Sequence, residues 1–165
     1  MFTTILVASD GSDTADRLVT VAQSLAKEDG ANVVVAHVNE LMAGRGGAHS
    51  VHPNEDLLQD KVRMQVADLK AAGLDAEIHM QSTMGKAAKS IAKMAIECHA
   101  DLIVAGASRH GPFADLVFGT AGQRMYRLAP CPVLVVPPKN PGPTRHGLRV
   151  VDGTGRSSHD SAPGE

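Results

Sequence analysis

The sequence predicts an α/β fold, a three-layer α/β/α sandwich built on a five-stranded parallel sheet. Apolar, β-branched runs alternate along the chain with segments whose apolar residues recur at helical spacing. Turns rich in glycine, proline, aspartate or serine separate the two kinds of segment. Strands that alternate with helices are joined by right-handed crossovers, which put helices on both faces of a parallel sheet. With 165 residues, 43% of them hydrophobic, the chain is long enough to bury one such core.

The first strand, helix and second strand are predicted over the first 38 residues. A near-continuous apolar run from Thr4 to Ser9 reads as a buried strand, and the turn at 10–13 that follows it offers side chains to cap a helix. Apolar residues then recur at helical spacing as far as Asp29-Gly30, where glycine can adopt the left-handed cap. The segment 33–38 is apolar almost throughout, as expected of a central strand covered on both faces.

The middle of the chain predicts a loop, a helix and an edge strand. Residues 39–53 are glycine-rich and aperiodic, so we expect a mobile loop there. Helical periodicity resumes at Asn54 and closes at Ala72-Gly73. The segment 74–80 alternates apolar and polar residues, which indicates a strand with one less protected face, at an edge of the sheet.

The last third predicts two further helix and strand pairs and then a tail. A helix opens at Gly85-Lys86 and ends near His99, and the fourth strand covers 102–105. A helical pattern spans 117–128, and Pro130 and Pro132 then precede a fifth strand over 133–136. We therefore expect one domain over residues 1–138. The segment 139–165, rich in Pro, Gly, Ser and charge, is expected to be a flexible tail because it can bury too little to offset its ordering entropy.

Composition excludes several classes of function. Sixteen basic against eighteen acidic residues give a formal charge of -2, so no overall charge draws the protein to nucleic acid or to an anionic membrane. Three phenylalanines and one tyrosine are too few for a base-stacking platform. Cys98 and Cys131 read as free thiols of a reducing compartment. With no targeting segment or membrane-length apolar run, the sequence predicts a cytoplasmic protein.

The usual catalytic and cofactor motifs are absent from the sequence. The pair Gly85-Lys86 lacks the upstream glycine and the following Ser or Thr of a P-loop, and Gly44-Arg-Gly46-Gly47 does not open a helix as a dinucleotide fingerprint does. No nucleophile elbow is present. His49 and His52 lack a third nearby ligand, so we interpret them as solvated loop residues and predict no metal site. We predict no catalytic residues.

The candidate ligand site lies at the carboxyl ends of the predicted first and fourth strands. Asp10 follows the first strand, and Gly106 is the first glycine of the stretch from 103 to 121, in which an apolar run becomes a glycine-spaced loop. These two ends flank the point where a doubly wound sheet reverses direction, which is where such sheets bind ligands. A carboxylate there can accept hydrogen bonds from ribose hydroxyls, and loop N–H groups can hold phosphates. Lys86, in the first turn of the predicted third helix, can reach an anion at the same end of the sheet. The alternatives are that Asp10 only shapes a turn, that the glycines only form a tight loop, and that Lys86 only faces solvent.

With these residues identified, the chain resembles the universal stress protein family over about residues 1–138. The resemblance rests on four segments in order, namely Ile5–Ser12, Val35–Val38, Ala100–Gly106 and Ala129–Val136. It implies a flavodoxin-like sheet with strand order 3-2-1-4-5 and a cytoplasmic protein that acts in stress adaptation. It also implies homodimers that pair through the fifth strand.

ATP-binding members of that family carry a glycine, two residues, a second glycine, nine residues, and then Gly-Ser or Gly-Thr. With Gly119-Thr120 at the end of this pattern, Gly106 falls on the first glycine, but Arg109 stands in place of the second. An arginine adds a Cβ where the backbone approaches phosphate, although its guanidinium can itself bind phosphate. The nucleotide site that the resemblance implies consists of Ala8, Ser9, Asp10, Val38 as a backbone contact to the base, Ala105, Gly106, Arg109, Gly119, Thr120 and Ala121.

Two functional hypotheses follow. In the first, the protein is a regulator that binds ATP, with or without Mg²⁺, or a related adenine nucleotide, hydrolyses it at most slowly, and passes the bound state to an unidentified protein partner. In the second, Arg109 closes the phosphate loop and the protein is a nucleotide-free, dimeric interaction module. Both include a homodimer, because the predicted edge strand is apolar and its unpaired backbone favours pairing with a second copy through Val133, Leu134, Val135 and Val136.

Overall fold

A computed structural model describes residues 1–106 and 128–137 of the chain. Its central sheet contains five parallel strands in the spatial order β4-β2-β1-β5-β6. When the parallel strands alone are numbered along the chain, this is the expected order 3-2-1-4-5. The strands are β1 (Thr4–Ala8), β2 (Asn32–Gly44), β4 (Ala76–Thr83), β5 (Leu102–Gly106) and β6 (Val133–Val136).

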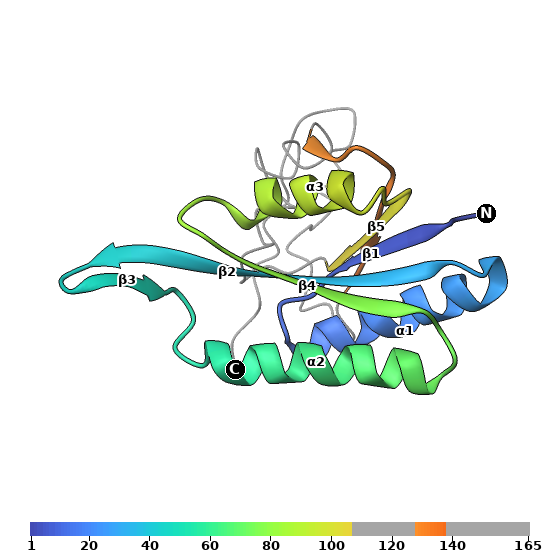
Figure 1. The fold of residues 1–165 in the computed structure, drawn as a ribbon, viewed down its shortest axis with the longest axis horizontal. Helices are drawn as coiled ribbons and strands as arrows, with labels where there is room; N and C mark the ends of the chain where they lie inside the picture. Colours follow the sequence, from blue (N-terminus) through green and yellow to red (C-terminus); the bar gives the residue numbers. More distant parts are fainter. Residues whose placement is uncertain (107–127, 138–165) are drawn as a thin grey trace, which may run out of the picture.

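Helices lie on both faces of the sheet, as predicted. Helices α1 (Asp13–Asp29) and α2 (Glu55–Ala71) cover one face, and α3 (Ala87–Glu97) covers the other (Figure 1). The ends of α1 follow from local chemistry. Ser12 is the N-cap and its hydroxyl accepts a hydrogen bond from the backbone N–H of Ala15, while Gly30 closes the helix in the left-handed conformation with φ 68°.

The two faces of the sheet bury separate clusters of apolar side chains. The cluster toward α1 and α2 joins alternate strand residues to one stripe of each helix, and it includes Val35, Leu18 and Val62. The cluster toward α3 takes the other alternate residues, including Leu6 and Ile91. This alternation is the two-residue period of a strand. It assigns every strand residue near the site to either the α1 and α2 face or the α3 face.

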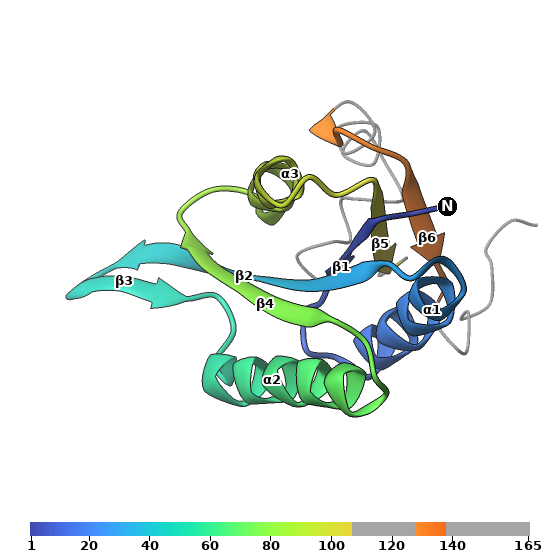
Figure 2. The ribbon, with the colours of Figure 1, turned by 45° about the vertical axis from the view of Figure 1, so that its right-hand side comes forward.

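The prediction of a mobile loop over 39–53 is wrong. Strand β2 continues to Gly44, and the chain turns back through positive-φ glycines at 46 and 47 into a short antiparallel strand, β3 (Gly47–Ser50). The backbone N–H of Val51 then donates to the carbonyl of Glu40 at 2.8 Å. This hairpin extends beyond the body of the domain (Figure 2). Periodicity did not reveal it because neither side of the ribbon packs on the core, so its sequence carries no apolar alternation.

One of the remaining predictions is confirmed, and the others concern residues outside the described ranges. Strand β4 pairs with β2 alone among the described strands, which confirms that it lies at an edge. Residues 117–127 of the predicted fourth helix, and the tail at 139–165, lie outside the described residues, so the boundary near 138 stays a prediction. Over the ranges 1–106 and 128–137, no helix is both long enough and apolar enough to cross a membrane.

Candidate functional site

The candidate site lies where the strand order reverses. Strands β1 and β5 are neighbours, with Ile5 paired to Leu102 and Val7 to Val104. From β1 the chain proceeds to β2 on one side, and from β5 it proceeds to β6 on the other. The carboxyl ends of β1 and β5 are therefore the switch point of the sheet, the position where open α/β sheets bind ligands.

Ser9 and Asp10 extend from β1 into this position. The backbone N–H of Ser9 donates to the carbonyl of Ala36 at 2.9 Å and continues the pairing of β1 with β2 by one residue. Ser9 is fully buried, whereas Asp10 is half-buried. One carboxylate oxygen of Asp10, Oδ1, accepts a hydrogen bond from the backbone N–H of Ser12 at 2.9 Å. Asp10 thus shapes the turn that starts α1.

Gly11 allows the turn to pass close to α2. Its φ is 70°, a region that residues with a Cβ rarely adopt. A Cβ placed there would lie 2.9 Å from the backbone oxygen of Leu58 and 3.0 Å from its Cα. Glycine is required at this position both for its conformation and for the contact.

Val38 and Gly106 complete the described part of the switch point. The carbonyl of Ala36 points toward β1, and because backbone groups alternate sides along a strand, those of Val38 point the same way, past the last residue of β1. A Cβ on Gly106 would make only ordinary contacts, 3.6 Å to Thr14 Cγ2 and 3.7 Å to Leu18 Cδ1. Packing among the described residues therefore does not demand glycine at 106.

A small cavity lies between the ends of β1 and β5 and the start of α1. Its volume is about 10 Å³, near the minimum that one water molecule occupies. Asp10, Thr14 and Gly106 are among the residues that line it. A nucleotide would therefore lie over the strand ends rather than inside this cavity.

The structure brings six of the ten predicted site residues together at the end of the sheet where β1 and β5 terminate. They are Ala8, Ser9, Asp10, Val38, Ala105 and Gly106. The other four, Arg109, Gly119, Thr120 and Ala121, lie outside the described residues.

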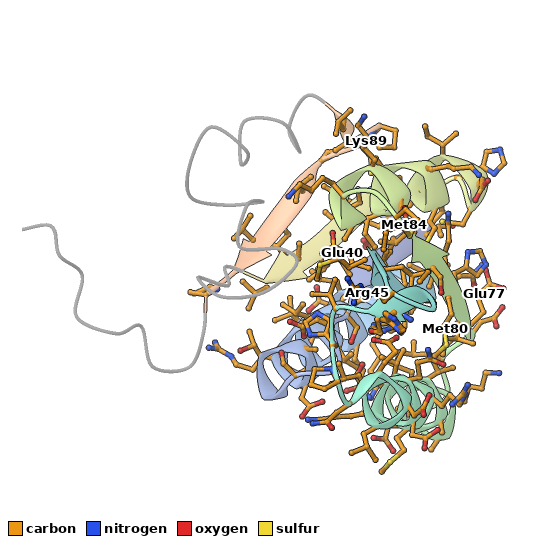
Figure 3. The ribbon with its side chains drawn as sticks, turned by 90° about the vertical axis from the view of Figure 1, so that its left-hand side faces the viewer. Glu40, Arg45, Glu77, Met80, Met84 and Lys89 are labelled. Carbon is orange, nitrogen blue, oxygen red and sulfur yellow. The ribbon has the colours of Figure 1, made fainter. Side chains whose placement is uncertain are left out.

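The N-terminus of α3 already binds a carboxylate of the chain. Glu40 Oε1 accepts a hydrogen bond from the backbone N–H of Ala87 at 2.7 Å, across 47 positions of sequence. Figure 3 shows Glu40 between the hairpin, with Arg45 at its tip, and α3. Lys86, considered above as an anion contact, is the N-cap residue of this helix and is exposed. Glu40 thus occupies the helix end at which we had considered a ligand anion.

Sequence reasoning missed a buried polar network under the site. His37, in the middle of an apolar strand, is 3% exposed and contacts both the Ser9 backbone and Glu55 of α2. The Ser9 hydroxyl donates to Gln65 Oε1 at 2.8 Å, and Gln65 Nε2 donates to Asp16 Oδ1 at 2.8 Å. The available signal was a histidine within a run that otherwise consists of valine and alanine, because a buried imidazole needs polar partners.

The loop histidines and the two cysteines are the other potentially reactive side chains that the sequence analysis singled out. Over residues 1–106 and 128–137, no three His, Cys, Asp or Glu residues gather as a metal site would require. His49 is exposed on β3 and His52 is half-buried. Burial raises the pKa of both free thiols, Cys98 and Cys131, which leaves them protonated and weakly nucleophilic at neutral pH.

The family of the chain is decided by a match to the family model described as "Universal stress protein family", which covers residues 1–137. This chain belongs to the universal stress protein family. A universal stress protein of Thermus aquaticus, from the region 3′ of a QAH/OAS sulfhydrylase gene, is 35% identical over 142 residues, which cover 82% of this chain and 99% of the relative.

Solved universal stress proteins share the fold. A family protein from Burkholderia pseudomallei is 27% identical with a TM-score of 0.59, and the match covers 82% of this chain and 96% of the other. A universal stress protein from Archaeoglobus fulgidus, solved in complex with dAMP, is 22% identical with a TM-score of 0.57, and the match covers 82% and 97% of the two chains. These matches confirm the family and the flavodoxin-like fold expected from the sequence.

Proposed function

We propose that this universal stress protein is a regulator that binds ATP, or a related adenine nucleotide, at the carboxyl ends of β1 and β5, beside the backbone of Val38 in β2. The observation that carries the proposal is the convergence of Asp10, the backbone of Val38 and Gly106 at the switch point of the sheet. The complex of the Archaeoglobus fulgidus protein with dAMP supports an adenine nucleotide as the ligand class. The proposed setting is stress adaptation in the cytoplasm.

Each group at the switch point has a separate role in this proposal. Asp10 uses Oδ1 for its own turn, and its second carboxylate oxygen accepts from ribose hydroxyls. The backbone N–H and C=O of Val38 face the gap beyond β1, where they can pair with the donor and acceptor edge of adenine. Phosphates lie toward Gly106 and the residues that follow it, including Arg109, Gly119, Thr120 and Ala121. No general base is assigned, so hydrolysis is slow at most.

The test is calorimetric titration of the full chain with ATP and Mg²⁺, repeated with the variant Asp10→Asn. Asparagine keeps the oxygen that accepts from Ser12 N but replaces the second oxygen with a donor, so the turn is preserved and the acceptor is lost. A hydrogen bond to a charged group contributes about 1.5–3 kcal/mol, so the affinity should fall about tenfold or more. The matched control is Asp75→Asn, which removes the same charge at the amino end of β4 and should leave affinity unchanged. No binding by the wild-type protein at millimolar ATP would overturn the proposal.

ATP binding by the variant Arg109→Gly distinguishes the nucleotide-binding regulator from the competing hypothesis of a nucleotide-free module. If the arginine binds phosphate, the variant binds ATP more weakly than the wild-type protein. If the arginine closes the phosphate loop instead, the wild-type protein does not bind ATP and the glycine variant gains binding.

We also propose that the protein forms a homodimer through β6. In the described residues β6 pairs only with β5, and Leu134 on it is 38% exposed. An apolar edge strand with an unpaired backbone favours pairing with a second copy through Val133, Leu134, Val135 and Val136. Light scattering at high protein concentration should give twice the chain mass, and Leu134→Lys should shift the protein toward monomer. A monomeric wild-type protein would contradict the proposal.

A further inference from the structure

The imidazole of His37 connects the proposed nucleotide site to α2. Its Nδ1 lies 2.9 Å from the backbone oxygen of Ser9, and its Nε2 lies 2.8 Å from Glu55 Oε1. A carbonyl oxygen can only accept a hydrogen bond, so Nδ1 carries a proton and donates it to Ser9. The geometry thus fixes which ring nitrogen faces the β1 turn.

The Glu55 side of this contact is held in place from α2. Glu55 is the first residue of the helix, where the partial positive charge of the N-terminus stabilises a carboxylate. The side-chain amide of Gln59 donates to the same oxygen, Oε1, at 3.0 Å. One proton lies in the contact between Oε1 and His37 Nε2, so both ring nitrogens of His37 are engaged and the ring cannot rotate without breaking two hydrogen bonds.

Ser9 is held by both its main chain and its side chain. His37 binds its carbonyl, while its hydroxyl donates to Gln65 and accepts from the backbone N–H of Gly11 at 3.2 Å. The Ser9 carbonyl belongs to the peptide unit that also contains the N–H of Asp10. The orientation of that unit determines the direction in which the Asp10 side chain leaves the backbone.

The His37 and Glu55 pair is not arranged for maximal stability. The second carboxylate oxygen, Glu55 Oε2, is buried and has no hydrogen-bond partner among residues 1–106 and 128–137. A buried polar atom without a partner has lost the hydrogen bonds that water gives it in the unfolded chain, which lowers the stability of the fold. An apolar pair of similar size would avoid that cost, so the ionisable pair calls for a role other than packing.

We propose that His37 is a positioning residue for the nucleotide site. By donating to the Ser9 carbonyl it orients the Ser9–Asp10 peptide so that the second carboxylate oxygen of Asp10 faces the switch point, and its bond to Glu55 anchors this arrangement to the first turn of α2. Nucleotide contact at Asp10 is thereby coupled to the start of α2, which directly follows the β2–β3 hairpin. The inference rests on the proposed nucleotide function.

Two substitutions of His37 separate its hydrogen bond to the Ser9 carbonyl from its hydrogen bond to Glu55. In His37→Asn, the side-chain amide can take the place of Nδ1 and donate to the Ser9 carbonyl, but it does not reach Glu55. In His37→Gln, the longer side chain can reach Glu55, but the donor to Ser9 is lost. The control is Val35→Ala, which removes buried volume from the same face of β2 without touching Ser9.

The readout is the ATP affinity of each variant at a temperature where thermal melts show it folded. We expect His37→Gln to lose about tenfold in affinity, the equivalent of one hydrogen bond, while His37→Asn and Val35→Ala stay within about threefold of the wild type. Equal affinities of the two His37 variants, with binding retained by the wild type, would overturn this inference alone. Absence of binding by the wild type would instead overturn the proposed function beneath it.

A measurement on the wild-type protein covers the case in which the His37 variants do not fold. The ring nitrogen shifts of His37, recorded by NMR, should identify a protonated Nδ1 and should move when ATP is added. His79, on the opposite face of the sheet and 3.4 Å from Glu77, is the internal control and should not move. If calorimetry shows that ATP binds and the shifts of both histidines stay unchanged, His37 is purely structural and the inference is overturned. If calorimetry shows no binding, the proposed function is overturned instead.

Discussion

Replacement of Gly11 by alanine tests the close contact between the β1 turn and α2. The backbone of Gly11 has φ 70°, and a Cβ at this position would lie 2.9 Å from Leu58 O and 3.0 Å from both Leu58 Cα and Cβ. The obstructing atoms belong to the first turns of a helix, so they cannot move aside as the end of a flexible side chain could. The substitution therefore imposes both a conformational strain and a collision.

A second glycine supplies the control for the conformational part. Gly30 has nearly the same φ, 68°, but a Cβ there would meet nothing within 4 Å. The left-handed conformation costs a residue with a Cβ about 1–2 kcal/mol, so Gly30→Ala should lower the free energy of unfolding by about that amount. Overpacking adds about 1–3 kcal/mol, so Gly11→Ala should cost about 2–5 kcal/mol in total.

The assay is urea unfolding of each variant, followed by far-UV circular dichroism. Midpoints are compared at a common slope, because a changed slope would indicate a changed unfolded or native state. The difference between the two alanine variants measures the contact of Gly11 with Leu58. If Gly11→Ala costs no more than Gly30→Ala, the turn does not approach α2 as described.

Two further predictions concern ionisable groups away from the site. Burial raises the pKa of Asp101, but hydrogen bonds from Thr3 and Thr4 outweigh it, so the net pKa lies below the ordinary value of 3.8. Between the lowered pKa and 3.8 the unfolded chain binds more protons than the folded one, so the contribution of this carboxylate to stability is complete above pH 3.8 and is lost as pH falls through the lowered pKa. The urea midpoint of Asp101→Asn should therefore depend less on acid pH than the midpoint of the wild-type protein. Because burial raises the pKa of the Cys98 and Cys131 thiols, a thiol reagent at neutral pH should modify them more slowly in the folded protein than in urea, and equal rates would contradict this.

Much of the fold could be predicted because local patterns encode it. Strand and helix periods identify the elements of residues 1–106 apart from the β2–β3 hairpin. Ser12 and Gly30 mark the ends of α1, and the strand predicted at 74–80 shows its edge position by alternation. The switch point follows from the order of the elements, since the right-handed crossover rule for parallel strands leaves few possible topologies. Six predicted site residues accordingly lie together where β1 and β5 terminate.

The hairpin could not be predicted in the same way. Its two strands are specified by pairing across the turn, with Met42 opposite His49, and by positive-φ glycines at 46 and 47. Because the ribbon packs on neither face of the domain, no apolar period distinguishes it from a glycine-rich loop.

The sequence alone determined the α/β class and the caps of α1, because these depend on residues close together in the chain. It also determined the position of the switch point, because that follows from the order of the elements. Only the tertiary structure decided the partners of the buried polar groups. His37 meets Glu55 across 18 positions, and Ser9 meets Gln65 across 56. The need of a buried polar atom for a partner is visible in the sequence, but which distant residue supplies that partner depends on how α2 packs against β1 and β2.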